Sequence, residues 1–222
     1  METGKSIDSC ETVSHKSVMV MMREMRDCFK IDVQQYVRAN MYTFMQLVDS
    51  VGGVEIDLTR AEADYINHPE GTYGEYHIQE MNVADQIQTV TVGVNHLNGA
   101  TAMLYARCRY IDNDWHRVER QRNVIQAVVN QAKSLNLREL NSLLDEVLPL
   151  VQTNLTEKEI TSLVLLAPNY QGITLEQMTI PADGTYGSMK GMGGRSMFST
   201  DFNQNAQILK QFIYEIKSSE VQ

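Results

Sequence analysis

Hydrophobic positions follow a helical period in some segments of the chain and a strand period in others. Residues 44–51 carry apolar side chains at helical spacing and end at two glycines, a combination typical of a helix C-terminus. Residues 54–58 alternate apolar and acidic side chains, which predicts a strand with one exposed face. The same patterns predict strands at 33–39, 89–94 and about 173–180, helices at 15–29 and from 99 to 166, and a closing amphipathic helix at 208–216. This order predicts an α/β fold, specifically a three-layer α-β-α domain with a central mixed sheet and a helix-rich middle of the chain.

The composition is that of a globular protein. Of the 222 residues, 43% are apolar and 21% are charged, which suits a substantial core and excludes a disordered or fibrous chain. We predict a single domain over residues 1–222, with a polar surface excursion at 62–86 and a glycine-rich loop at 183–200. The glycines of that loop match neither the P-loop nor the dinucleotide-binding spacing, so a flexible surface loop is favoured over a phosphate cradle.

Arginines are concentrated in one stretch of an acidic chain. The formal net charge is −9, yet residues 105–122 hold five arginines and no lysine: Arg107, Arg109, Arg117, Arg120 and Arg122. A guanidinium group is planar, always charged and able to bind two phosphate oxygens at once. The cluster therefore indicates a bound anion, with pyrophosphate or a phosphodiester as the first candidate.

The segment after Asp114 has a helical period with one apolar stripe. Its members are Val118, Ile125, Val128, Val129, Ala132 and Leu135. On this wheel Gln121 lies in the middle of the stripe and Arg117 at its edge, whereas Arg120 points to the far side. A buried polar group needs a partner, because an unpaired one costs on the order of 1–3 kcal/mol.

That partner is either a ligand or other side chains of the protein. In the second case Asp112, Asp114 and Glu119 would neutralise the arginines in an intramolecular network. We favour a ligand, because three acids cannot pair with five arginines.

Several motifs together resemble the LytR-CpsA-Psr family, over residues 20 to 170 of the chain. They are Tyr36-Val37-Arg38, Phe44, the stretch from Val48 to Ile56, Leu97-Asn98-Gly99, Ala106-Arg107-Cys108-Arg109, Asp114, Arg117-Val118-Glu119-Arg120-Gln121 and Thr153-Asn154-Leu155-Thr156. The combined pattern is specific, because it does not depend on one short motif.

The resemblance implies an envelope phosphotransferase of mainly Gram-positive bacteria, involved in cell wall biogenesis. Members of the family transfer a glycopolymer, such as teichoic acid or capsule, from polyprenyl pyrophosphate to peptidoglycan and release the lipid phosphate. By position, Arg107, Arg109, Arg117 and Gln121 match the residues that hold the pyrophosphate, and Asp114 matches an acidic position beside them. These five are the candidate catalytic residues, and magnesium is the cofactor that the resemblance implies.

The chain departs from the family's pattern at its beginning. Residues 1–30 do not resemble the segment in which family members carry the aspartates that hold magnesium. We therefore expect the magnesium ligands to be missing from this chain, and its enzymatic activity is left open. The apolar runs fall short of the roughly 20 residues of a membrane span, so we expect the extracytoplasmic membrane face only for a full-length protein. The resemblance also implies two first strands that this chain lacks. Their loss would expose unpaired backbone, which predicts a homo-oligomer.

Two other functions remain open. A transcriptional regulator or attenuator would place the arginine-bearing helix in a DNA groove, but the net charge of −9 and the lack of helix-turn-helix spacing disfavour nucleic acid as a partner. A non-catalytic module would bind polyprenyl phosphate without turnover. The histidines lack metal-ligand spacing, and Cys10, Cys28 and Cys108 are expected to be free thiols.

Overall fold

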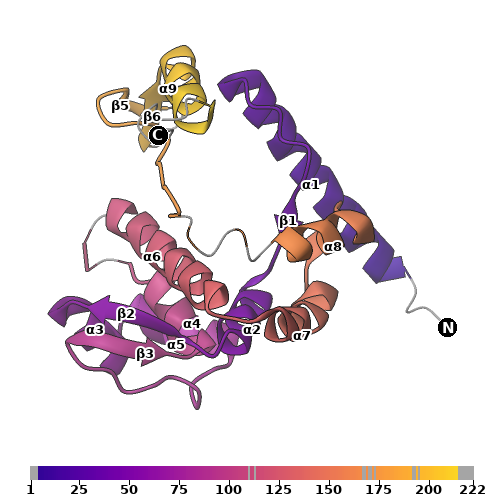
Figure 1. The fold of residues 1–222 in the computed structure, drawn as a ribbon. Coiled ribbons are helices and arrows are strands. Elements are labelled where there is room, and N and C mark those ends of the chain that lie inside the picture. Colours follow the sequence, from indigo (N-terminus) through magenta and orange to yellow (C-terminus); the bar gives the residue numbers. More distant parts are fainter. Residues whose placement is uncertain are drawn as a thin grey trace. The chain divides into compact units, whose positions relative to one another are not determined.

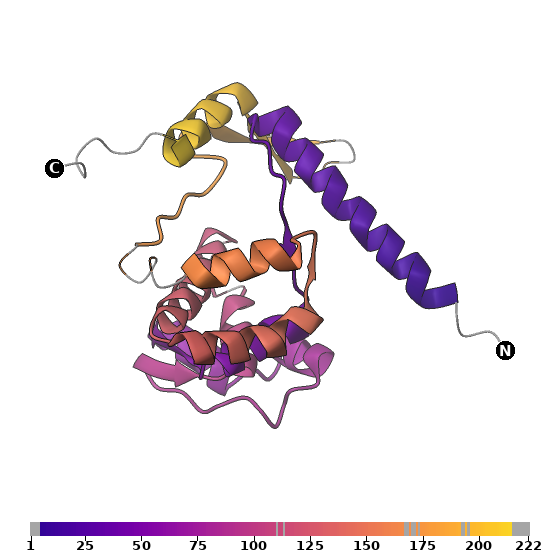
Figure 2. The ribbon, with the colours of Figure 1, turned by 45° about the vertical axis from the view of Figure 1, so that its right-hand side comes forward.

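The structure is a computed structural model that describes residues 5–109, 111–112, 114–166, 169, 172, 174–191, 194 and 196–214. Within helices and strands, the side chains of residues 5–16, 114, 196 and 198 are outside the description. Contacts divide the chain into two compact units, Met1–Tyr36 with Glu176–Gln222 and Val37–Leu175. Each unit is described by itself, and Figures 1 and 2 show the elements of both.

The larger unit contains most of the helices. In chain order it is built from β1 (Val37–Arg38), α2 (Met41–Ser50), β2 (Val54–Leu58), α3 (Arg60–Asn67), α4 (Tyr73–Met81), β3 (Gly93–Leu97), α5 (Gly99–Ala106), α6 (Asp114–Lys133), α7 (Leu137–Val147), the 3-10 turn η1 (Leu148–Leu150), β4 (Gln152–Thr153) and α8 (Glu157–Leu166). The helices predicted at 44–51 and through most of 99–166 are confirmed, as is the strand at 54–58.

The strands of the larger unit pair in antiparallel ladders. Strands β2 and β3 pair from Val54 opposite Leu97 to Leu58 opposite Gly93, and β1 pairs with β4. Along β2 buried and exposed residues alternate, as the sequence predicts. The α/β class is confirmed, but the sheets among the described residues are three separate two-stranded antiparallel pairs. The expectation of a central mixed sheet is wrong for this part of the chain.

Side chains explain why the strand predicted at 89–94 is not there. The amide of Asn67 both donates to the Val90 carbonyl oxygen at 2.7 Å and accepts from the Val90 N–H at 2.9 Å. The N–H of Thr91 donates in the same way to Asn95 Oδ1 at 2.9 Å. Backbone groups that a ladder would pair are thus taken by side chains, and β3 begins only at Gly93. The strand predicted at 33–39 shortens to β1, and the described residues 174–180 form no strand.

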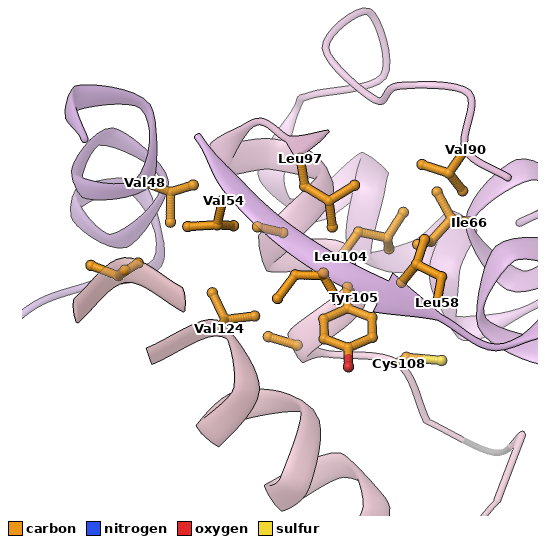
Figure 3. Packing of buried hydrophobic residues seen from close by; sticks show 14 of the residues in the cluster. Val48, Val54, Leu58, Ile66, Val90, Leu97, Leu104, Tyr105, Cys108 and Val124 are labelled. Carbon is orange, nitrogen blue, oxygen red and sulfur yellow. The ribbon is translucent and has the colours of Figure 1, made fainter. Parts of the chain in front are cut away.

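The core of the larger unit lies between the antiparallel β2–β3 pair and its covering helices. Figure 3 shows the buried residues that form it, among them Val48, Val54, Leu58, Ile66, Val90, Leu97, Leu104, Tyr105, Cys108 and Val124. Helix α5 is buried along all eight of its residues. A Cβ atom added to Gly99 would lie 2.1 Å from the carbonyl oxygen of Met45, so only glycine allows α2 and α5 to approach this closely. The Gly99 N–H also donates to Asp49 Oδ1 at 2.7 Å, which fixes the start of α5.

Residues 62–86 were predicted to be an irregular surface excursion, but they contain parts of two helices. Helix α3 begins with a capping box, in which Thr59 and Glu62 satisfy each other's backbone N–H groups. It buries Ala63, Tyr65 and Ile66, and Glu62 is buried beside them at 8% exposure. A buried glutamate gives a polar pattern, which is why the sequence reads as an exposed segment.

The smaller unit contains α1 (Lys5–Phe29), β5 (Tyr186–Lys190), β6 (Ser196–Thr200) and α9 (Phe202–Tyr214). The segment predicted as a glycine-rich loop at 183–200 includes an antiparallel hairpin, from Tyr186 opposite Thr200 to Lys190 opposite Ser196. Asn205 is fully buried and donates to the hydroxyl of Thr185 at 2.8 Å. The predicted helices at 15–29 and 208–216 correspond to α1 and α9; residues 215 and 216 lie outside the described part of the chain. No helix in the described residues could cross a membrane.

Candidate functional site

The arginine cluster lies where the fully buried helix α5 gives way to α6. Arg107 is the C-cap of α5, and its guanidinium Nη2 lies 2.8 Å from Glu80 Oε2 of α4, with 22% of the Arg107 side chain exposed. Cys108 follows and is buried at 1%, whereas Arg109 is exposed. The Cys108 side chain therefore points into the core and the Arg109 side chain toward solvent. The buried Cys108 anchors the backbone from which the charged Arg109 extends.

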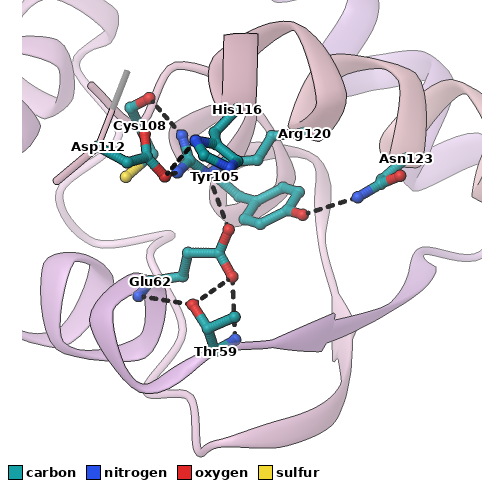
Figure 4. Close-up of polar contacts among 8 residues, drawn as sticks. All are labelled: Thr59, Glu62, Tyr105, Cys108, Asp112, His116, Arg120 and Asn123. Carbon is teal, nitrogen blue, oxygen red and sulfur yellow. Dashed lines mark hydrogen bonds and ion pairs between the residues drawn. The ribbon is translucent and has the colours of Figure 1, made fainter. Parts of the chain in front are cut away.

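Arg120 of α6 is the centre of a buried polar network, shown in Figure 4. Only 2% of Arg120 is exposed. Its Nε donates to Glu62 Oε1 at 2.7 Å, its Nη1 donates to the Cys108 carbonyl oxygen at 3.0 Å, and its Nη2 pairs with Asp112 Oδ2. The network thus joins helix α3, the connection after α5 and the second turn of α6.

The structure corrects the helical wheel of α6. Arg120 was predicted to point to the far side, yet it shares the buried face with Val124 and Val128. Gln121, predicted in the middle of the buried stripe, is exposed, and so is Ile125 at 49%. The wheel followed apolar side chains alone and so could not place a buried arginine, because the carboxylate that accepts its hydrogen bond lies 58 residues away along the chain.

The ionisation of Glu62 and Arg120 reflects this pairing. Burial alone raises the pKa of Glu62, but hydrogen bonds from the Thr59 backbone, Arg120 and the Thr59 hydroxyl outweigh it, and the net pKa is lowered. For Arg120 burial lowers the pKa, but the Glu62 hydrogen bond and the nearby acidic groups outweigh it, and the net pKa is raised. Both groups are therefore charged at neutral pH, which a buried ion pair requires.

The other candidate residues are distributed around this network. Gln121 and Arg109 are exposed, and Arg117 and Arg122 are partly exposed. Arg117 lies one helical turn before Arg120, on the part of α6 that is closest in sequence to the connection. Asp114 begins α6, but its side chain is outside the described residues.

Acidic side chains pair with Arg107 and Arg120. Glu62 and Asp112 accept from Arg120, and Glu80 pairs with Arg107. Asp112 was predicted as such a partner, whereas Glu62 and Glu80 were missed. The sequence did carry one signal for Glu62, because a threonine three residues before a glutamate marks a capping box.

Comparison with known proteins gives the lineage of this fold. The sequence model of the LytR_cpsA_psr family matches residues 12–213. The chain belongs to this family. The predicted resemblance is therefore confirmed.

Curated relatives in the family carry two kinds of name. The chain is 27% identical over 186 residues to the polyisoprenyl-teichoic acid–peptidoglycan teichoic acid transferase TagU of Bacillus mycoides, which covers 82% of this chain and 53% of TagU. It is 30% identical over 160 residues to the TagU of Halalkalibacterium halodurans, covering 70% of this chain and 45% of that protein. It is also 31% identical over 133 residues to the biofilm regulatory protein A of Streptococcus mutans, covering 59% and 30%. The chain spans about half the length of the TagU proteins that it matches.

Solved structures of LytR_cpsA_psr proteins share the fold. TagT bound to LI-WTA superposes with a TM-score of 0.63 at 20% identity, covering 90% of this chain and 66% of that chain. TagT of B. subtilis gives a TM-score of 0.61 at 19% identity, covering 90% and 67%.

Magnesium is the metal ion that the resemblance to the LytR_cpsA_psr family implies. Mg²⁺ is bound in proteins through carboxylate oxygens and water. In the residues that the structure describes, no group of three or more His, Cys, Asp or Glu side chains is placed to hold a metal ion. The described side chains therefore do not form a magnesium site by themselves, and magnesium stays an expectation from the family.

Proposed function

We propose that this chain is the pyrophosphate-binding part of an envelope phosphotransferase. Its substrate would be a glycopolymer of the teichoic acid or capsule type linked to polyprenyl pyrophosphate, and its acceptor would be peptidoglycan. Arg107, Arg109 and Arg117 would hold the pyrophosphate, Gln121 would orient it, and Asp114 would lie beside them. The names of the TagU relatives and the TagT structure with bound LI-WTA support this substrate class.

One observation carries the proposal: the arginine cluster is divided between an internal role and an outward one. Arg120 is buried and neutralised, and it holds the carbonyl of Cys108, the residue between Arg107 and Arg109. Arg109 and Gln121 are exposed, and Arg117 is partly exposed one turn from Arg120. The backbone that carries these exposed guanidinium groups is held by the buried Arg120. Such an arrangement suits the recognition of a bulky anion in one orientation.

In the proposed reaction, negative charge develops on phosphate oxygens. An acceptor hydroxyl loses its proton to solvent water and forms a bond to the phosphorus that carries the polymer. The bond from that phosphorus to the bridging oxygen breaks, and the bridging oxygen leaves with the lipid phosphate. Charge builds on the leaving phosphate, where N–H donors of Arg107, Arg109 and Arg117 would stabilise it. When bound, magnesium would add further neutralisation of the pyrophosphate.

This function implies a place and partners. A polyprenyl tail keeps the substrate in a membrane, so the full-length protein would work at the extracytoplasmic membrane face, beside peptidoglycan. The homo-oligomer stays a prediction. In the described part of the larger unit, the short strand β3 exposes Val94 at 68%, an apolar side chain that a second copy would cover. Light scattering tests this prediction.

A DNA-binding regulator is the weaker alternative. Arg120 is buried in ion pairs, Arg107 is paired with Glu80, and the chain carries a net charge of −9. Each of these reduces the positive surface that phosphate backbones attract.

Calorimetric titration of a short-chain polyprenyl pyrophosphate, with and without magnesium, tests the proposal. Arg109→Ala and Arg117→Ala should each weaken binding by about tenfold or more, which corresponds to about 1.4 kcal/mol. Arg60→Ala is the matched control, because the Arg60 side chain is 81% exposed and pairs only at the surface with Asp64. No binding to the parent chain, or equal losses in all three variants, would overturn the proposal. Release of lipid phosphate from a lipid-linked polymer on adding peptidoglycan fragments then separates an enzyme from a binding module.

A further inference from the structure

Arg120 contacts two described residues of the connection between α5 and α6. At the start of the connection the Arg107 and Cys108 N–H groups donate to the carbonyls of Met103 and Tyr105, at 3.0 Å each, which completes the end of α5. Arg120 then binds the Cys108 carbonyl oxygen and the Asp112 carboxylate. One side chain of the next helix is therefore bonded to both Cys108 and Asp112.

A third hydrogen bond of Arg120 links this connection to helix α3. Its Nε donates to Glu62, which is held in turn by the Thr59 N–H at 2.9 Å and the Thr59 hydroxyl at 2.7 Å. The guanidinium is a rigid planar fork, so three acceptors that bind it have a fixed geometry relative to one another. A lysine ammonium at the same place is a point charge on a flexible stem and cannot impose that geometry.

We propose that Arg120 is a positioning residue for anion binding: its buried guanidinium holds the Cys108 carbonyl and the Asp112 carboxylate, and the held Cys108 backbone orients its neighbours Arg107 and Arg109. This proposal rests on the proposed function and deepens it. Ordering a free backbone costs conformational entropy. A Cys108 backbone that is held before binding avoids that cost on binding, and affinity rises accordingly.

The charges around Arg120 favour a positioning role over direct attraction of the anion. Arg120 is compensated by two carboxylates, and His116 Nδ1 lies 3.8 Å from Asp112. Its positive charge is therefore neutralised inside the protein, and a direct contribution to an external anion is small. The effect of Arg120 on binding must pass through the backbone that it holds.

The test combines amide exchange with a double-mutant cycle on the full 222-residue chain. Arg120→Lys keeps the charge but loses the fork. Asp112→Asn removes the charge of the Asp112 side chain, which is 28% exposed, and keeps an amide oxygen as a weaker acceptor, so this second variant is expected to fold. Both should speed hydrogen exchange in residues 108–112 and weaken binding of a short-chain polyprenyl pyrophosphate, by about tenfold for Arg120→Lys. Arg60→Ala is the control, because the Arg60 side chain is 81% exposed and pairs with Asp64 at the surface of the same helix α3, away from the Arg120 network.

The cycle pairs Arg120→Lys with Arg109→Ala. If Arg120 acts through the connection, its substitution should weaken binding much less in the Arg109→Ala background than in the parent. Fully additive losses, or unchanged exchange at 108–112 in both Arg120→Lys and Asp112→Asn, would overturn the positioning role. A parent chain that does not bind the lipid would instead refute the proposed function, while the exchange rates would still show whether Arg120 orders the connection.

Discussion

Removing the Arg120 guanidinium should strand a buried carboxylate. In Arg120→Met the flexible side chain fills a similar volume, but Glu62, whose side chain is 11% exposed, loses its charged partner. The Cys108 carbonyl loses its donor as well. Asp112 is more exposed and can turn to water, so the stranded charge is that of Glu62.

Breaking a buried ion pair on one side typically costs 3–5 kcal/mol, and we expect the low end, about 3 kcal/mol, because Glu62 keeps its hydrogen bonds from Thr59. Adding Glu62→Gln should recover most of this loss. Glutamine preserves the capping box of α3 and carries no charge, so the double variant leaves no buried ion. Urea unfolding followed by the single tryptophan, Trp115 at the start of α6, measures the larger unit.

The pH dependence gives an independent check. The pKa of Glu62 is lowered in the folded chain, so its pairing contributes stability above the ordinary value of 4.5 and loses that contribution as the pH falls through the folded pKa. The stability difference between the parent and Arg120→Met should therefore be largest at neutral pH and shrink below pH 4.5. A loss under about 1 kcal/mol at pH 7, or a double variant less stable than Arg120→Met, would refute the buried-pair reasoning.

Three further predictions concern packing, reactivity and charge. Gly99→Ala should destabilise the larger unit by about 1–3 kcal/mol in urea unfolding, because the added methyl group meets the Met45 carbonyl, whereas alanine at an exposed glycine of the β5–β6 hairpin should be nearly neutral. Burial raises the pKa of Cys108 to about 12, so in the folded chain at pH 8 iodoacetamide followed by mass spectrometry should label Cys108 far more slowly than Cys28, and equal rates would contradict its burial. Glu80→Gln should strengthen pyrophosphate binding by a few-fold, about 1 kcal/mol by calorimetry, because the arginine at the end of α5 loses a competing carboxylate; weaker binding would mean that Glu80 orients that arginine instead.

Local patterns in the sequence were sufficient for elements whose cause is local. Helix α2 ends at Ser50, just before Gly52 and Gly53, which both have positive φ, and β2 alternates as its residues predict. The α/β class and the family followed from such patterns and from the arginine motif.

Errors arose where a distant side chain decides the structure. Asn67 takes the backbone groups of Val90 across 23 residues, and this displaces a predicted strand. Glu62 pairs with Arg120 across 58 residues, and this ion pair allows the charged Arg120 side chain of α6 to be buried in the core. Hydrophobic periodicity could not predict Asn67 or Glu62 as partners, because it describes only residues of the same helix or strand. The motif located the candidate arginines, but only the fold distinguishes the buried arginine from those that reach solvent.

Hydrogen exchange mapped with and without a short-chain polyprenyl pyrophosphate would show where the anion binds. We expect the ligand to slow exchange in residues 105–122, and Arg117→Ala to abolish this protection at the same ligand concentration. Protection confined to other segments, such as the β5–β6 hairpin, with no change at 105–122 would contradict the placement of the pyrophosphate on the arginine cluster.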